Sequence, residues 1–156
     1  MRERARQKIA ELIERYPALA SCRSDMEAAA AALIRTFAAG KKLLVCGNGG
    51  SAADAEHIVG ELMKGFLKPR RLSSAMREKL AAAFPETAAY LYENLQGTLP
   101  AISLVDAVAL NTAFANDQAP DLAMAQQVLG LGQAGDALLG ISTNYQIGRA
   151  SCRERV

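Results

Sequence analysis

The sequence has no tryptophan, few aromatic residues and a single histidine. Among its 156 residues, 5% are aromatic and 51% are hydrophobic, so the core is expected to consist of aliphatic side chains and alanine. A core of this kind is typical of helices packed on a sheet. One domain is the expected organisation, because a chain of this length is long enough to bury one hydrophobic core.

Long apolar runs and an excess of charge are also missing. No run approaches the roughly 20 apolar residues of a membrane span, and the charged residues 1–6 lack the apolar stretch of a secretory signal. The formal net charge of +2 arises at the end of the chain, where Arg149, Arg153 and Arg155 outnumber Glu154. We therefore expect a cytoplasmic protein with no membrane contact and no basic surface for nucleic acid.

The most informative stretch is an apolar strand followed by a glycine-rich turn and a helix. The strand covers 43–46, the turn reads Gly47-Asn48-Gly49-Gly50, and Ser51 opens the helix. Glycine permits positive φ and the close approach of a ligand. The amides and the positive dipole end of a helix N-terminus bind anions such as phosphate. In a second interpretation the glycines only make a tight turn.

Neither of two familiar nucleotide motifs fits this stretch. The turn lacks the Gly-Lys-Ser/Thr of the nucleotide P-loop, and it also lacks the third glycine of the dinucleotide-binding fingerprint. The expected anion is therefore the phosphate of a smaller molecule.

The helix after the turn carries the only histidine and a carboxylate. His57 and Glu61 are four residues apart and therefore lie on one face of the helix. An imidazole and a carboxylate at this spacing can share a metal ion or a proton. The structural alternative is a hydrogen-bonded pair that only stabilises the helix. A phosphate site beside such a pair predicts an enzyme that acts on a small phosphorylated molecule.

Apolar periodicity and chain breakers predict helices that alternate with strands. Strands that alternate with helices form a parallel sheet covered on both faces, an α/β fold whose ligands bind at the carboxyl ends of the strands. The expected strands cover 43–46, 101–104 and 137–142. The expected helices cover 4–16, a segment from a cap at Ser24 or Asp25 to Gly40, 51–63, a segment that starts at Ser73 or Ser74 and runs to Phe84, 88–95, 106–115 and 121–131.

The run from Gly47 to His57, together with Glu61, closely resembles the sedoheptulose-7-phosphate isomerase (phosphoheptose isomerase) family, which belongs to the sugar-isomerase, or SIS, domains. Two further stretches agree in order: 100–104 leading to Ala115-Asn116-Asp117, and 135–143. The resemblance implies an SIS-type three-layer α/β/α sandwich with a parallel sheet. The domain then covers 1–143, with N-terminal helices in 1–40 and a helical insertion at about 64–99.

The resemblance also implies roles for individual residues. His57 corresponds to a zinc ligand, and Glu61 corresponds to a ligand that also serves as the acid–base catalyst, so zinc is the implied cofactor. The implied substrate-binding residues are Asn48, Gly49, Gly50, Ser51, Asn116, Asp117, Ser142 and Thr143.

The residues themselves leave other interpretations open. Asn116 and Asp117 also fit a helix end and a turn, and Ser142 and Thr143 also fit the end of a strand. Asp106 is expected to be a helix N-cap. Lys68, Arg70 and Arg71 form a small basic cluster around Pro69 and are expected to lie in a solvated loop.

The implied activity is aldose–ketose isomerisation of a sugar phosphate through an enediol(ate), with sedoheptulose 7-phosphate as the first candidate. The alternative is a non-catalytic phosphosugar-binding SIS module with a regulatory role or an association with the bacterial replication initiator. The pair of His57 and Glu61 favours the enzyme, because a binding module has no need of it. The insertion at 64–99 favours the module, because it sits beside the pair and can reshape the pocket.

The end of the chain departs from the family. There, a strand of this kind continues into Ser-Gly-Asn-Ser and another helix, whereas residues 144–156 show neither. This tail resembles vector or frameshift read-through from Ile147 onward; the alternative is a divergent natural C-terminus. The family's remaining zinc ligands, a glutamine and a histidine, come from a C-terminal helix that these 156 residues do not contain. We therefore expect a truncated chain that is by itself a poor isomerase.

Self-association is expected from the N-terminal helices. Their apolar stripes, Ile9, Leu12 and Ile13 in one helix and Leu33, Ile34 and Phe37 in the next, exceed what one small sheet can cover. The family assembles as dimers of dimers, so a homodimer or homotetramer is the implied assembly.

Overall fold

A computed structural model describes residues 3–65 and 67–143. Within these ranges the strands β1 (Leu43–Gly47), β2 (Ala101–Ser103) and β3 (Ala137–Ile141) form a parallel sheet in the order β2-β1-β3. Leu43 pairs with Ala101 on one side and with Ala137 on the other, so β1 is the central strand. The tail predicted to be foreign to the protein, residues 144–156, lies outside the described residues.

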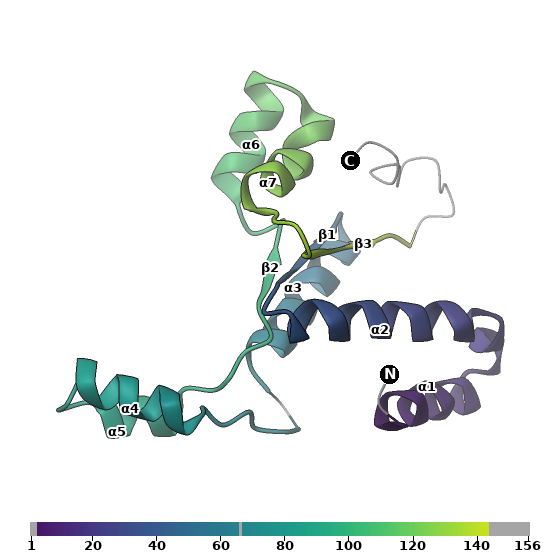
Figure 1. Cartoon of the computed structure of the whole chain (residues 1–156). Coiled ribbons are helices and arrows are strands. Elements are labelled where there is room, and N and C mark those ends of the chain that lie inside the picture. The colour runs from purple at the N-terminus through teal and green to yellow at the C-terminus, as the bar shows by residue number, and fades with distance from the viewer. Residues whose placement is uncertain (1–2, 66, 144–156) are drawn as a thin grey trace.

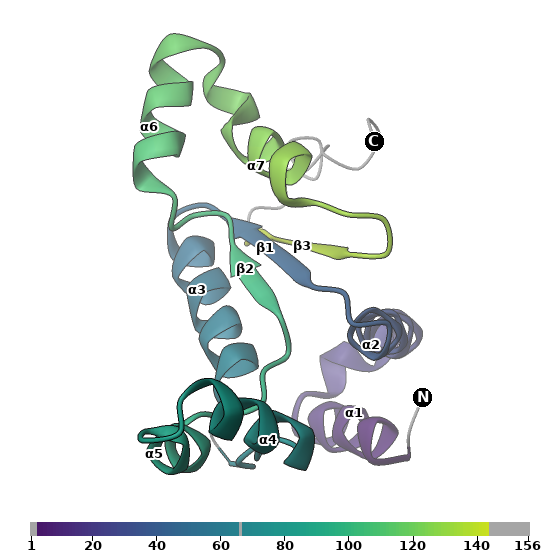
Figure 2. The same cartoon turned by 60° about the vertical axis from the view of Figure 1, so that its left-hand side comes forward.

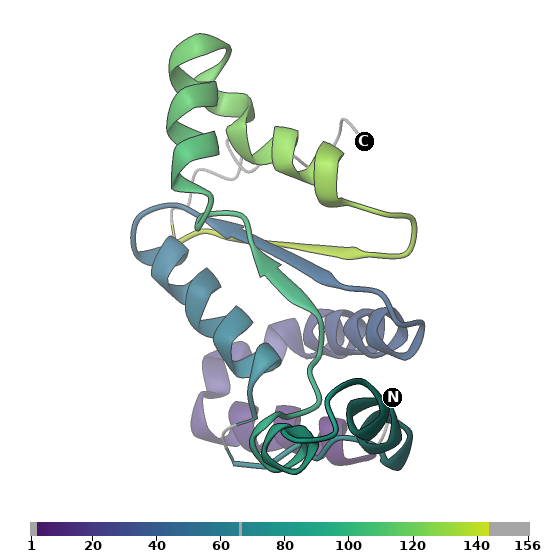
Figure 3. The same ribbon diagram turned by 90° about the vertical axis from the view of Figure 1, so that its left-hand side faces the viewer.

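Helices cover both faces of this sheet (Figure 1). Seen from the side, α2 and α3 lie below the sheet, and α6 and α7 lie above it (Figure 3). This layered arrangement confirms the predicted α/β class. The helices are α1 (Glu3–Arg15), α2 (Arg23–Ala38), α3 (Gly50–Met63), α4 (Ser74–Ala83), α5 (Ala88–Asn94), α6 (Val108–Asp117) and α7 (Ala123–Leu131), with short 3₁₀ turns η1 (Pro17–Cys22) and η2 (Pro120–Leu122). Within the described ranges, no helix is long and apolar enough to cross a membrane.

The hydrophobic core lies between the sheet and helices α2 and α3. Val45 and Ala55 are completely buried, and Leu44 on the opposite face of β1 is 2% exposed. Burial of β1 on both faces explains its continuous apolar sequence. Helices α6 and α7 cover the second face less completely, since Leu138 of β3 is 47% exposed. The partly buried side chains that pack on the core are Leu33, Phe37, Ile58, Val59, Leu62, Ala137, Leu139 and Ile141.

Helix starts test the capping predictions. The expected helix start at Ser73 or Ser74 is confirmed: α4 begins at Ser74, and the hydroxyl of Ser73 caps it by accepting a hydrogen bond of 3.2 Å from the backbone N–H of Met76. The predicted cap at Ser24 or Asp25 is wrong: η1 runs directly into α2, which already begins at Arg23 and has no side-chain cap.

The N-cap predicted at Asp106 is also wrong. Helix α6 begins only at Val108, and its N-cap is Ala107, with no side-chain cap. Asp106 instead lies in the loop after β2, where its carboxyl group has another neighbour, described below.

The insertion between α3 and β2 carries the two expected helices. Helices α4 and α5 pack against each other, and they form an arm that projects from the rest of the chain (Figures 1 and 2). We call α4, α5 and the segments that connect them to α3 and β2 the α4–α5 arm.

An ion pair joins the beginnings of β1 and β3. The Nζ of Lys42 lies 2.6 Å from Oδ2 of Asp136, and the two side chains are only 19% and 7% exposed. The same carboxylate accepts hydrogen bonds from the backbone N–H groups of Lys42, at 3.0 Å, and Gln133, at 2.8 Å. The hydrogen bond from the Lys42 side chain and those from the backbone lower the pKa of Asp136 to about 2.

We predict that Asp136→Asn lowers the melting temperature at pH 7, because it removes the ion pair with Lys42 that joins the beginnings of β1 and β3. A carboxyl group with a lowered pKa stabilises the fold above its unfolded pKa, near 3.8, and this stabilisation is lost as the pH falls toward 2. The difference between wild type and variant should therefore narrow between pH 5 and pH 3 in thermal unfolding. Asp121→Asn, at an exposed acid on η2, is the matched control. A difference that is the same at both pH values would contradict this role.

Candidate functional site

The candidate site begins where β1 ends against α3. Helix α3 starts at Gly50, one residue before the predicted start at Ser51. Gly49 has φ of 58°, a left-handed conformation that favours glycine. A Cβ on Gly47 would lie 2.4 Å from the carbonyl oxygen of Ser51, so only glycine fits there. Backbone geometry therefore accounts for Gly47 and Gly49 without a ligand.

Gly50 differs from these two glycines. A Cβ at this position would meet no atom within 4 Å, and its φ is not positive. Neither packing nor backbone conformation requires glycine there. The absence of a side chain leaves open space at the first residue of α3, where an anion would approach the helix N-terminus.

The end of β3 lies beside this turn. Gly47 is in register with Ile141, so the structure brings the predicted residues Ser142 and Thr143 to the same edge of the sheet as Asn48. Asn48, Gly49, Gly50, Ser142 and Thr143 are exposed. Ser51 is 4% exposed, because the first turn of α3 packs against the end of β1. Two of the three predicted substrate-binding segments therefore lie next to each other.

His57 and Glu61 lie on the exposed side of α3. The opposite side of this helix packs Ala55, Ile58 and Leu62 on the core. Among the described contacts no hydrogen bond or ion pair joins the two side chains, so the interpretation as a hydrogen-bonded helical pair is not supported. Within residues 3–65 and 67–143, no three histidine, cysteine, aspartate or glutamate residues come close enough to hold a metal ion.

The third predicted segment lies elsewhere. Asn116 and Asp117 end α6, and this end of the helix points away from the sheet (Figures 1 and 3). The amide of Asn116 donates a hydrogen bond of 2.8 Å to the Asp117 carboxylate. The described structure therefore does not bring this pair to the turn between β1 and α3.

The sequence did not predict the acidic pair formed by Glu56 and Asp106. A hydrogen bond to Asp106, and the negative charge of that residue, raise the pKa of Glu56. The pair connects the exposed side of α3 with the loop after β2. The two residues are 50 positions apart in the sequence, so their contact could not be predicted from local patterns. The only signal was the position of Asp106 just after a predicted strand. A carboxyl group with a raised pKa stabilises the fold at low pH, and this stabilisation is lost as the pH rises.

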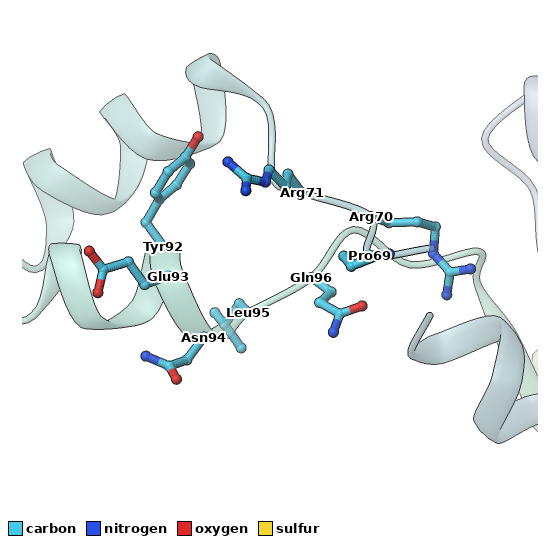
Figure 4. Close-up of a pocket in the computed structure, with 8 residues that line it drawn as sticks. All are labelled: Pro69, Arg70, Arg71, Tyr92, Glu93, Asn94, Leu95 and Gln96. Carbon is cyan, nitrogen blue, oxygen red and sulfur yellow. The ribbon is translucent and has the colours of Figure 1, made fainter. Parts of the chain in front are cut away.

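Two cavities border the described structure. One, of about 470 Å³, runs along the free edge of β2 between α3 and α7, and Asp106 is part of its wall. The other, of about 340 Å³, lies in the α4–α5 arm and is lined by the eight residues labelled in Figure 4. Neither is lined by residues of the turn between β1 and α3.

Comparisons with known proteins agree with this architecture. The profile of the SIS domain family matches residues 6–78. Phosphoheptose isomerase from a Nitratiruptor species is 45% identical over 105 residues, which are 67% of this chain and 42% of that protein. Phosphoheptose isomerase from Shewanella denitrificans is 34% identical over 149 residues, which are 95% of this chain and 63% of that protein.

A solved structure gives the same result. The chain superimposes on phosphoheptose isomerase GmhA from Neisseria gonorrhoeae with a TM-score of 0.52 and 28% identity, over 90% of this chain and 54% of that one. These matches support the assignment of the chain to the phosphoheptose isomerase family. The chain spans 42% of the length of the Nitratiruptor protein and 63% of the length of the Shewanella denitrificans protein. The family resemblance read from Gly47 to Glu61 is thereby confirmed.

We predict opposite effects on stability for two Gly→Ala substitutions, one at Gly47 at the start of the turn and one at Gly60 inside α3. Gly47→Ala should destabilise the protein by about 1–3 kcal/mol, the usual cost of overpacking, because the new methyl group would overlap the Ser51 carbonyl. Gly60→Ala, in the interior of α3 with nothing within 4 Å, should stabilise it by about 0.5–1 kcal/mol, the helix-propensity difference. Urea unfolding measures both. Equal stability of Gly47→Ala and wild type would contradict the close contact between β1 and α3.

Proposed function

We propose that the protein from which this chain comes is a phosphosugar isomerase that interconverts an aldose and a ketose through an enediol(ate). Sedoheptulose 7-phosphate is the proposed substrate. The observation that carries the proposal is the position of one helix in a chain of this family. The N-terminus of α3 meets the ends of β1 and β3, and the same helix carries His57 and Glu61 on its exposed side.

The phosphate would be held by neutral groups. The sequence has no lysine or arginine in 43–63 or in 100–143. The amides at the start of α3 and the hydroxyl groups of Ser142 and Thr143 would contact the phosphate, and the helix dipole would favour its negative charge. Asn48, Gly49, Gly50 and Ser51 complete this proposed site. Phosphate binding away from the reacting carbons supplies binding energy that the isomerisation step can use.

Glu61 is the proposed base that moves a proton between neighbouring carbons of the sugar. His57 and Glu61 present a nitrogen and an oxygen donor, which are ligand types of zinc, and both are exposed without a hydrogen bond to each other. They would hold zinc together with further ligands from outside the described residues, since zinc binds about four ligands. When bound, zinc would stabilise negative charge that develops on the sugar oxygen.

Asn116 and Asp117 belong to the proposal only as family positions. They would act on the substrate in the assembled protein, because the described part of the chain does not place them beside Ser51. The comparisons do not favour the non-catalytic binding module, because the named relatives are phosphoheptose isomerases. The proposed location is the cytoplasm, where charged sugar phosphates are retained.

We predict that Glu61→Gln in the full-length protein lowers kcat by about 10²- to 10⁴-fold, the typical contribution of a general base. The amide keeps the shape of the side chain but removes its basicity, so the affinity for sedoheptulose 7-phosphate should change little. Turnover and substrate binding are measured together with metal content, because Glu61 is also a proposed zinc ligand. Full activity of the metal-loaded variant would remove Glu61 from the mechanism.

We also propose that the chain self-associates, as a dimer or tetramer, through its N-terminal helices. Leu33 and Phe37 pack on the core, but Leu12 of α1 and Ile34 of α2 are 38% and 41% exposed. A symmetric contact between two copies would bury them.

We predict that light scattering at micromolar concentration gives a multiple of the 16.6 kDa chain mass. The double variant Leu12→Glu with Ile34→Glu should reduce this mass, because it places charge in the contact. Leu129→Glu, at an exposed leucine of α7, is the matched control and should not. A stable wild-type monomer would overturn the proposal.

A further inference from the structure

The C-terminal end of α3 is held by an arginine from the α4–α5 arm. The last carbonyl groups of a helix have no partner within the helix and need one from elsewhere. Arg70 supplies it: its Nη2 donates to the carbonyl oxygens of Leu62, at 2.6 Å, and Glu61, at 3.3 Å. A cation at this end of a helix is also favoured by the helix dipole. Arg70 lies in a loop, as expected, but its half-buried guanidinium group is bonded to carbonyl groups and not simply solvated.

The same arginine closes the base of the arm. Its Nε donates to the carbonyl oxygen of Gly97 at 2.8 Å, and the N–H of Gly97 donates to the carbonyl oxygen of Arg70 at 2.6 Å. The N–H of Leu99 donates to the carbonyl oxygen of Leu62 at 2.9 Å. One guanidinium group thus connects the last turn of α3 with the segment that enters β2.

We propose that Arg70 is a positioning residue for Glu61, and this proposal rests on the proposed isomerase function. Glu61 lies in the last turn of α3, and Arg70 donates a hydrogen bond to the backbone carbonyl oxygen of Glu61. Helix ends without such partners open locally at little cost in free energy. A base in an unrestrained last turn would lose its position relative to the sugar carbons. The sequence suggested that the α4–α5 arm reshapes the pocket. In this proposal the arm instead stabilises the end of the helix that carries the base.

Arg71 provides a matched control in the same cavity wall. In Figure 4 the two arginines point in opposite directions, Arg70 toward a helix end of the body and Arg71 toward the side where Tyr92 lies. Arg71 is exposed, and no side-chain hydrogen bond or ion pair is recorded for it among the described residues. Arg70→Ala and Arg71→Ala therefore remove the same charge from the arm, but only the first removes the contacts with α3.

The test compares Arg70→Ala, Arg70→Lys and Arg71→Ala in the full-length protein. A misplacement of about 1 Å costs roughly 10²-fold in rate, so Arg70→Ala should lower kcat for sedoheptulose 7-phosphate by about 10- to 100-fold, with KM close to wild type. Arg70→Lys keeps the charge but cannot reach three carbonyl groups with one ammonium, and it should restore part of the loss. Arg71→Ala should keep the wild-type kcat.

Hydrogen exchange supplies a readout that does not depend on activity. Amides in the last turn of α3 and at Leu99 should exchange faster in Arg70→Ala, while those of β1 should not change. Unchanged exchange or an unchanged kcat in Arg70→Ala overturns the proposal, as does an equal loss of kcat in Arg71→Ala. A wild-type protein that isomerises no sugar phosphate would refute the proposed function instead. Hydrogen exchange alone would then decide whether Arg70 holds the last turn of α3.

Discussion

The contact between the end of β1 and the first turn of α3 is the constraint on which the rest of the candidate site depends. Gly47 approaches Ser51 so closely that a single methyl group would collide with its carbonyl oxygen. Gly49 then takes a positive φ to turn the chain into the helix. Because β1 is the central strand and pairs with β3 up to Ile141, this turn also fixes where α3 begins relative to Ser142 and Thr143.

Helix α3 is consequently held at three places along its length. The glycine contact fixes its start, the completely buried Ala55 packs its middle on the sheet, and Arg70 bonds the carbonyl groups at its end. His57 and Glu61 lie on the exposed side of the helix, where a substrate can reach them. A rigid helix can keep an imidazole and a carboxylate at a constant separation from a bound phosphate, which proton transfer at a neighbouring carbon requires.

Local signals in the sequence predicted the elements well, whereas contacts between distant residues could not be predicted. The apolar run at 43–46, the helix start at Ser73 or Ser74 and the glycine turn each depend on neighbours in sequence, and the structure has all three. Asp106 was interpreted as a cap because its local sequence permits one, but its carboxyl group interacts with Glu56, 50 positions away. Arg70 likewise follows a proline and has the sequence of a loop residue. Its role comes from the fold, which returns the arm to the end of α3.

The charges around α3 follow a single electrostatic pattern. The segments that surround its N-terminus contain no lysine or arginine, so a phosphate there would depend on the positive end of the helix dipole. The guanidinium of Arg70 stands at the opposite, negative end. An anion at the start of a helix and a cation at its end are both stabilised by the same dipole. The acidic pair of Glu56 and Asp106 lies between these ends. A negatively charged ligand is therefore favoured at the turn after β1 rather than along the exposed side of the helix, where the proposed base operates.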